Sequence, residues 1–155
     1  MKTVEHGRMY RVQKYKIFYV KETGVPVESR QISHKRDVQE FALKQLQEHP
    51  FESVLIVALD SRNKIIGYTR TEGTVNQCAV YPREVFSFLF SCGAAAFIMV
   101  HNHPGGGTNP SEADWALTKK LKNAGDGLDI PMHDHLIVSD DQCVSFREMV
   151  RWGER

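Results

Sequence analysis

AAAFIMVHNHPGGGTNPSEAD, residues 94–114, contains the clearest structural signals in the sequence. Residues 94–100 are apolar throughout, and a short uncharged run of this kind predicts a strand that is covered on both faces. The three glycines at 105–107 then let the chain turn without bulky side chains, and Ser111 has the position of a helix cap. The stretch therefore predicts a buried strand, a loop and the start of a helix.

Strand and helix patterns also alternate on both sides of this stretch. Runs of β-branched and apolar residues predict strands at 9–20, at 53–60, at 65–71 and in two short pieces of 135–146 that are joined by SDDQ. Apolar residues three and four positions apart predict helices at 34–49 with Ser33 as cap, from Tyr81-Pro82-Arg83 onward, and at 112–124 with Gly125 as the end. Strands mixed with about three helices predict an α/β (α+β) domain with a mixed central β-sheet.

The length of the chain fits a single domain. A sequence of 155 residues is long enough to bury a substantial core. We predict that residues 33–150 form this domain and that residues 1–32 form an N-terminal extension that adds a strand. The function of that extension and the oligomeric state stay open.

Composition argues against several classes of partner. Twenty Lys and Arg residues against nineteen Asp and Glu residues give a net charge of +1, so no overall field attracts nucleic acid or an acidic membrane. Three cysteines without a C-x-x-C spacing indicate reduced thiols. The amino-terminal sequence lacks an apolar signal segment, and the apolar run at 85–100 is shorter than the roughly 20 residues of a spanning helix. We therefore expect a soluble, cytoplasmic protein.

Two histidines directly follow the predicted buried strand. His101 and His103 are two positions apart, so they project from the same face if the strand continues through them. Asp114 lies in the first turn of the next predicted helix, where it can approach the end of the strand. Two imidazoles and one carboxylate are three protein ligands, the number that a catalytic zinc ion commonly has beside water. These residues are candidate ligands for Zn²⁺.

Structural alternatives exist for the same residues. Ser111 and Asp114 match the capping box, in which a serine and an acid stabilise a helix start without any metal. His133 and His135 repeat the H-x-H spacing, but no acid-bearing helix start follows them. We favour a structural role for them, or one in which a partner such as Asp134 orients a ligand from the second layer around a metal.

The spacing of His101, His103, Ser111 and Asp114 resembles the JAMM (MPN+) metalloprotease motif, H-x-H-x7-S-x2-D. The wider sequence resembles the RadC-like JAB-domain proteins of bacteria. That resemblance runs from about residue 38 to residue 148 and includes EGTVNQCAVYPREVF, AAAFIMVHNHPGG and DHLIVSDDQCVSFRE.

The resemblance implies a role for each motif residue. His101, His103 and Asp114 would hold Zn²⁺, and Ser111 would help to stabilise the developing oxyanion. An upstream glutamate acts as general base in the JAMM family, and Glu52, just before the predicted strand at 53–60, corresponds to it. Glu72 and Glu84 are rival candidates for the base.

The chemistry that follows is hydrolysis of an amide by metal-activated water. The expected function is a zinc-dependent metallopeptidase or isopeptidase acting on a peptide or protein substrate, whose identity the sequence leaves open. A DNA-repair-associated protein and a non-catalytic binding module of the RadC-like family are the alternatives. The near-neutral charge disfavours nucleic acid as the partner, and no membrane partner is expected.

Overall fold

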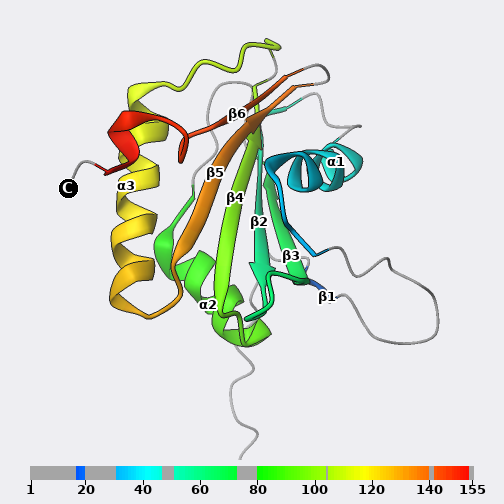
Figure 1. Cartoon of the computed structure of the whole chain (residues 1–155), viewed down its shortest axis with the longest axis vertical. Helices are drawn as coiled ribbons and strands as arrows, with labels where there is room; N and C mark the ends of the chain where they lie inside the picture. The colour runs from blue at the N-terminus through cyan, green and yellow to red at the C-terminus, as the bar shows by residue number, and fades with distance from the viewer. Residues whose placement is uncertain are drawn as a thin grey trace, which may run out of the picture.

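A mixed β-sheet lies at the centre of the molecule (Figure 1). The computed structural model describes residues 17–19, 31–46, 51–72, 80–103, 105–139 and 142–153. Within these residues, six strands follow the order β1-β3-β2-β4-β5-β6. β4 and β5 are parallel, and the other neighbouring pairs are antiparallel. The bounds are β1 Ile17–Tyr19, β2 Ser53–Leu59, β3 Ile65–Glu72, β4 Ala96–Asn102, β5 Met132–Val138 and β6 Cys143–Ser145.

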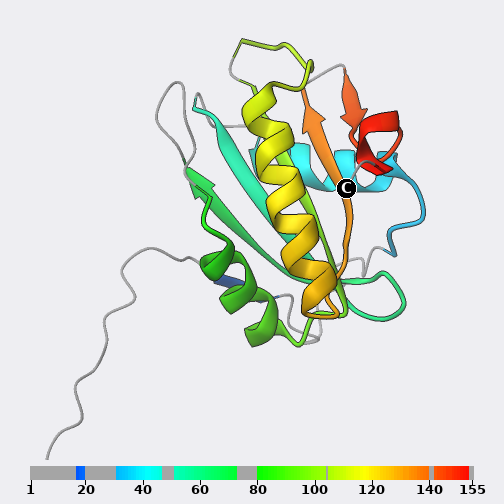
Figure 2. The ribbon, with the colours of Figure 1, turned by 90° about the vertical axis from the view of Figure 1, so that its left-hand side faces the viewer.

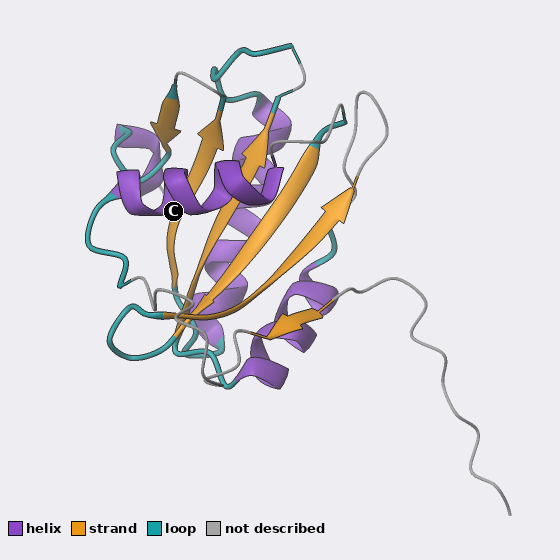
Figure 3. Cartoon of the chain, turned by 90° about the vertical axis from the view of Figure 1, so that its right-hand side faces the viewer, coloured by secondary structure: helices purple, strands orange, loops and turns teal. Residues whose placement is uncertain are grey.

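Helices cover both faces of this sheet. In the described part of the chain they are α1 Lys35–Leu46, α2 Pro82–Cys92, α3 Glu112–Gly127 and the short 3-10 helix η1 Val150–Gly153. Figure 2 shows α2 and α3 together on one face, and Figure 3 shows α1 crossing the strands on the other. None of these helices combines the length and the apolar character that crossing a membrane requires. The predicted α/β domain with a mixed sheet and three flanking helices is confirmed.

Side chains of the central strands alternate between two buried layers. Leu55 and Val57 of β2 belong to the cluster under α1, whereas Val54 and Ile56 belong to the cluster under α2 and α3. Every residue of β2 is buried, as are the first six residues of β4. Helices on both faces thus explain why these strands are continuous apolar runs, as predicted for residues 94–100.

α1 and α2 begin close to where the sequence predicted, but the residue that caps α1 is different. α2 begins at Pro82, where a missing backbone N–H leaves no hydrogen bond unmade. α1 begins at Lys35, and the Asp37 carboxylate accepts hydrogen bonds from the backbone N–H groups of Ser33 and His34 at 2.9 and 2.8 Å. Ser33 therefore lies one residue before the cap position, and Asp37 takes over the predicted capping. The predicted end of this helix, at 47–49, lies outside the described residues.

α3 continues past the end that the sequence predicted. Gly125 lies inside this helix, which ends at Gly127. A Cβ atom on Gly125 would lie 2.5 Å from the backbone oxygen of Ile130 and 3.2 Å from the ring of Phe97. The prediction of Gly125 as a helix stop is wrong, because this glycine serves the close approach of α3 to β4 and to the turn before β5.

An edge strand precedes the domain core. β1 pairs antiparallel with β3 and lies at one end of the sheet order. Residues 1–16 and 20–30 lie outside the described residues, and most of the predicted strand at 9–20 falls there. The division into an extension at 1–32 and a domain at 33–150 therefore stays a prediction.

The carboxyl end of β4 lies beside the amino end of α3, at the end of the sheet where the parallel strands β4 and β5 finish. Because β4 and β5 are parallel and α3 connects them, α3 runs back along the sheet before β5 begins. In the loop between them, the N–H of Gly106 donates to the backbone oxygen of His103 at 2.9 Å. Gly106 has φ 75°, a left-handed conformation that suits glycine. This turn returns the chain so that the polar end of β4 faces the first turn of α3.

Candidate metal centre

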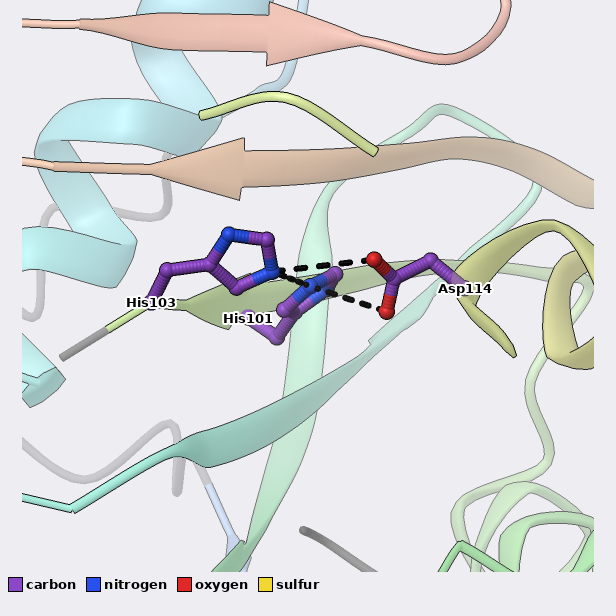
Figure 4. Close-up of side chains that lie close together, drawn as sticks. All are labelled: His101, His103 and Asp114. Carbon is purple, nitrogen blue, oxygen red and sulfur yellow. Dashed lines mark hydrogen bonds and ion pairs between the residues drawn. The ribbon is translucent and has the colours of Figure 1, made fainter. Parts of the chain in front are cut away.

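Three side chains converge where β4 ends and α3 begins (Figure 4). His101 lies in β4, His103 directly follows that strand, and Asp114 lies in the first turn of α3. The Nε2 atoms of the two histidines are 2.9 Å apart. The Nε2 of His101 is 3.4 Å from Oδ1 of Asp114, and the Nε2 of His103 is 3.6 Å from Oδ2. The fold thus brings the three predicted ligand residues together.

The separations suit one shared metal ion. Ligands about 2.0–2.1 Å from a tetrahedral zinc ion lie roughly 3.3–3.4 Å from one another. The two nitrogens are 2.9 Å apart, and each lies 3.4 or 3.6 Å from a different oxygen of the Asp114 carboxylate. One ligand atom from each of the three residues lies within 4.8 Å of the other two. Imidazole nitrogen and carboxylate oxygen are donor atoms that zinc accepts. The residues therefore fit a three-ligand metal site.

The cluster is closed toward the core and open toward solvent. The side chain of His101 is 2% exposed, that of Asp114 13% and that of His103 23%. Burial lowers the pKa of His101 to about 4, although Asp114 raises it and His103 adds a smaller lowering. His101 is therefore neutral at pH 7, the form of imidazole that binds metals. Access to the cluster is from the side of His103.

Asp114 is also part of a helix cap. Its Oδ2 accepts hydrogen bonds from the backbone N–H of Ser111 and from the Ser111 hydroxyl, both at 2.7 Å. In return, the Ser111 Oγ accepts from the backbone N–H of Asp114 at 3.1 Å. The complete capping box is therefore present, together with the approach of Asp114 to the histidines. The hydroxyl proton of Ser111 is directed at Asp114 in this structure.

Glu52 lies beside this cluster. It directly precedes β2, whose Val54 pairs with His101. Burial raises the pKa of the half-buried Glu52 carboxyl, His103 lowers it and Asp114 raises it. The carboxyl of Glu52 therefore interacts electrostatically with two of the three cluster residues.

Glu72 and Glu84, the other candidates for the general base, have different surroundings. Glu72 ends β3 and forms an ion pair with Arg70 at 3.0 Å. Glu84 lies in the first turn of α2.

Asn102 fixes the chain on both sides of Glu52. Its Oδ1 accepts from the backbone N–H of Ser53 at 2.8 Å, and its Nδ2 donates to the backbone oxygen of Phe51 at 3.3 Å. The residue between the two histidines therefore connects the end of β4 to the segment that carries Glu52. Sequence reasoning missed this contact, although H-x-H spacing does direct the middle residue away from the histidines.

A second layer of side chains contacts His101 from the core. His101 Nδ1 is 2.7 Å from His135 Nε2, and His135 Nδ1 is 2.6 Å from the hydroxyl of Thr118. The His135 ring stacks on Phe146 with 4.1 Å between centroids. His135 thus has the second-layer place that the sequence suggested. Thr118 was missed, although its spacing of four from Asp114 puts both on one face of a helix.

Asp134 does not orient His135 through its ring. The Asp134 carboxylate accepts from the Ser145 hydroxyl at 2.7 Å and from the backbone N–H groups of His135 and Arg147 at 2.7 and 3.1 Å. The suggestion that Asp134 orients a histidine ligand is therefore wrong. Asp134 instead ties β5 to β6 and to the turn after it.

Comparison with known families identifies the domain. The family model for the RadC-like JAB domain matches residues 32–151, which include the whole cluster. The chain belongs to this family. The predicted resemblance is confirmed, and the matched residues run from just before α1 to the first residues of η1. The three convergent residues, the cap at Ser111 and His135 all lie within the residues that this family model matches.

Similar proteins of this family occur in Shewanella. The UPF0758 protein of Shewanella baltica (strain OS185) is 39% identical over 111 residues, which are 71% of this chain and 49% of that protein. The UPF0758 proteins of Shewanella sp. (strain ANA-3) and Shewanella loihica are each 40% identical over 111 residues, with the same coverage of 71% and 49%. This RadC-like chain therefore spans about half the length of the curated relatives it matches.

Proposed function

We propose that this RadC-like JAB domain is a zinc-dependent metallopeptidase or isopeptidase. The convergence of His101, His103 and Asp114 at ligand-like separations carries the proposal. The open side at His103 and the nearby carboxyl of Glu52 support it, because amide hydrolysis needs space for a substrate and a group that moves protons. The proposed substrate is a peptide or protein, and the amide is a peptide bond or an isopeptide bond to lysine.

His101, His103 and Asp114 would hold the ion. When bound, zinc would polarise the carbonyl group of the scissile amide and make water more acidic. Glu52 accepts a proton from the attacking water and returns it to the leaving nitrogen, so that water and amide become an acid and an amine. The raised pKa of Glu52, caused first by burial, brings this carboxyl closer to neutral pH and favours proton transfer in both directions.

Ser111 would donate a hydrogen bond to the oxyanion that develops on the carbonyl oxygen. Its hydroxyl now donates to Oδ2 of Asp114, so this role requires the O–H to rotate toward the substrate. Rotation leaves the cap in place, because Oγ can still accept from the backbone N–H of Asp114.

We also propose that the domain works in a reducing compartment such as the cytoplasm. Cys92 and Cys143 are free thiols among the described residues, and the chain has an odd number of three cysteines.

The first experiment measures zinc per chain in protein purified without added metal. We expect about one zinc ion per chain in the wild type and loss of that ion in His103→Ala. Zinc-loaded protein is then screened against fluorogenic peptides and lysine-linked isopeptides, with Glu52→Gln as the inactive control. A wild type that takes up no zinc after reconstitution would contradict the proposal.

Two other results would favour the alternative functions. If the wild type and Glu52→Gln both bind zinc and neither hydrolyses any substrate, the result would favour a binding module. DNA binding that weakens steeply with salt would favour a repair-associated role, since phosphate contacts release counterions.

A further inference from the structure

A continuous path of hydrogen bonds leads from α3 to the metal-facing atom of His101. The Thr118 hydroxyl donates to the backbone oxygen of Asp114 at 2.6 Å. The same hydroxyl oxygen is 2.6 Å from Nδ1 of His135, whose Nε2 is 2.7 Å from Nδ1 of His101. The path thus begins at the backbone of Asp114 and returns, through His101 Nε2, to within 3.4 Å of Oδ1 of the same residue.

All members of this path are shielded from solvent. Thr118 is 2% exposed, His135 0% and His101 1%. Water therefore does not compete for their hydrogen bonds, and burying a charged ring in this layer is unfavourable. Each ring is accordingly neutral, with one N–H and one bare nitrogen.

The number of available protons fixes which group donates in each hydrogen bond of the path. Thr118 has one hydroxyl proton, and the carbonyl oxygen of Asp114 can only accept it. The Thr118 oxygen must then accept from Nδ1–H of His135. That leaves Nε2 of His135 bare, so it accepts from Nδ1–H of His101. The remaining nitrogen of His101, Nε2, consequently has a lone pair and no proton.

We infer that Thr118 and His135 are positioning residues that hold His101 in the tautomer whose Nε2 is free to bind a metal ion. The inference deepens the proposed function and rests on its metal site. Hydrogen bonds from the second layer commonly fix the tautomer and the ring orientation of a histidine ligand. The stacking of His135 on Phe146, at an interplanar angle of 17°, also restrains the ring that transmits this choice.

The path predicts what happens when the threonine oxygen is lost. In Thr118→Val, His135 Nδ1–H faces a methyl group, and an unpaired buried donor is unfavourable. The ring can avoid this by moving its proton to Nε2 and donating to His101. The proton of His101 then moves to its own Nε2, where it blocks the metal position.

The test compares Thr118→Val with Thr118→Ser, which restores the hydroxyl. Zinc affinity is measured by competition with a chromophoric chelator. We expect the dissociation constant to rise by about 10–100-fold in Thr118→Val and to stay at the wild-type value in Thr118→Ser. Thr69→Val is the matched control, since Thr69 is a buried threonine whose hydroxyl has no hydrogen-bond partner among the described residues. His135→Phe keeps an aromatic ring against Phe146 but removes the acceptor, and we expect it to weaken zinc binding like Thr118→Val.

A spectroscopic measurement tests the tautomers without metal. Histidine ¹⁵N NMR of the metal-free wild type should show Nδ1–H and bare Nε2 for both His101 and His135, and Thr118→Val should show the reverse. Melting curves of the metal-free variants verify that each is folded.

The possible outcomes separate this inference from the proposed function. A wild type without zinc contradicts the proposed function. Equal zinc affinity in the wild type and Thr118→Val overturns the inference alone, as does a proton on Nε2 of His101 in the metal-free wild type.

Discussion

Zinc should stabilise the folded domain, and removal of His103 should abolish that effect. The donor atoms of the cluster lie within 4.8 Å of one another only because β4 and α3 meet. A ligand that binds the folded chain stabilises it by RT ln(1 + [L]/Kd), which is about 2.7 kcal/mol at a free concentration about 100 times Kd. His103→Ala removes one ligand of this cluster, so the variant should melt at the same temperature with and without zinc.

The length of the chain converts this free energy into a melting temperature. An unfolding entropy of roughly 2.1 cal/mol/K per residue gives about 0.33 kcal/mol/K for 155 residues. Dividing about 2.7 kcal/mol by this entropy predicts a rise in Tm of about 8 °C on zinc loading. Asp114→Ala should show no rise, and it should also melt about 3 °C lower without metal, because loss of a helix cap costs about 1 kcal/mol.

The assay is circular-dichroism melting in a zinc buffer and in chelator, with free zinc set from the measured Kd. His34→Ala is the control, because His34 is exposed and lies outside the cluster. Equal zinc-induced rises in His103→Ala and the wild type would refute the reasoning, since they would locate the stabilising ion elsewhere. Loss of the rise in His34→Ala would refute it as well.

Three further predictions concern the surroundings of the cluster. Asn102→Ala should lower the free energy of unfolding in urea by about 1–2 kcal/mol, because two hydrogen bonds to the chain at 51–53 are lost, while zinc content stays unchanged. Gly125→Ala should lower the free energy of unfolding by about 1–3 kcal/mol in the same assay, because the added Cβ would lie 2.5 Å from a backbone oxygen. Gly127→Ala is its control and should not lower this free energy, because no atom lies within 4 Å of the added Cβ. Burial raises the pKa of the Cys143 thiol to about 11, so at pH 8 only about one thiol in 1,000 is ionised. The rate of alkylation of Cys143, followed by peptide mapping, should therefore rise about tenfold per pH unit up to pH 10.

Sequence patterns predicted the parts of the fold that depend on local chemistry. The run at 94–100 has no polar residue because both faces of β4 are covered, so its burial could be inferred directly. The start of α2 at Pro82 follows from the fixed φ of proline and its missing N–H. The common side of His101 and His103 follows from the two-residue period of a strand. Each of these signals is contained in a short segment.

Residues that act through distant partners could not be predicted in this way. Thr118 matters because His135, 17 residues later, contacts its hydroxyl. Asn102 matters because Phe51 and Ser53, about 50 residues earlier, lie beside it. Gly125 illustrates a different problem, because a glycine that ends a helix and a glycine that permits close packing look alike in a sequence.

The helix cap and the metal ligand, which the sequence presented as alternatives, are compatible in Asp114. A carboxylate has two oxygens, and Oδ2 serves the cap at Ser111 while Oδ1 lies 3.4 Å from His101. The cap therefore fixes the direction of the carboxylate before a metal binds. Ser111→Ala should release it and weaken both α3 and zinc binding. Only a loss of turnover that persists at saturating zinc, about 10²–10³-fold for a missing oxyanion donor, would assign Ser111 a part in the reaction. Full turnover under that condition would limit Ser111 to the cap.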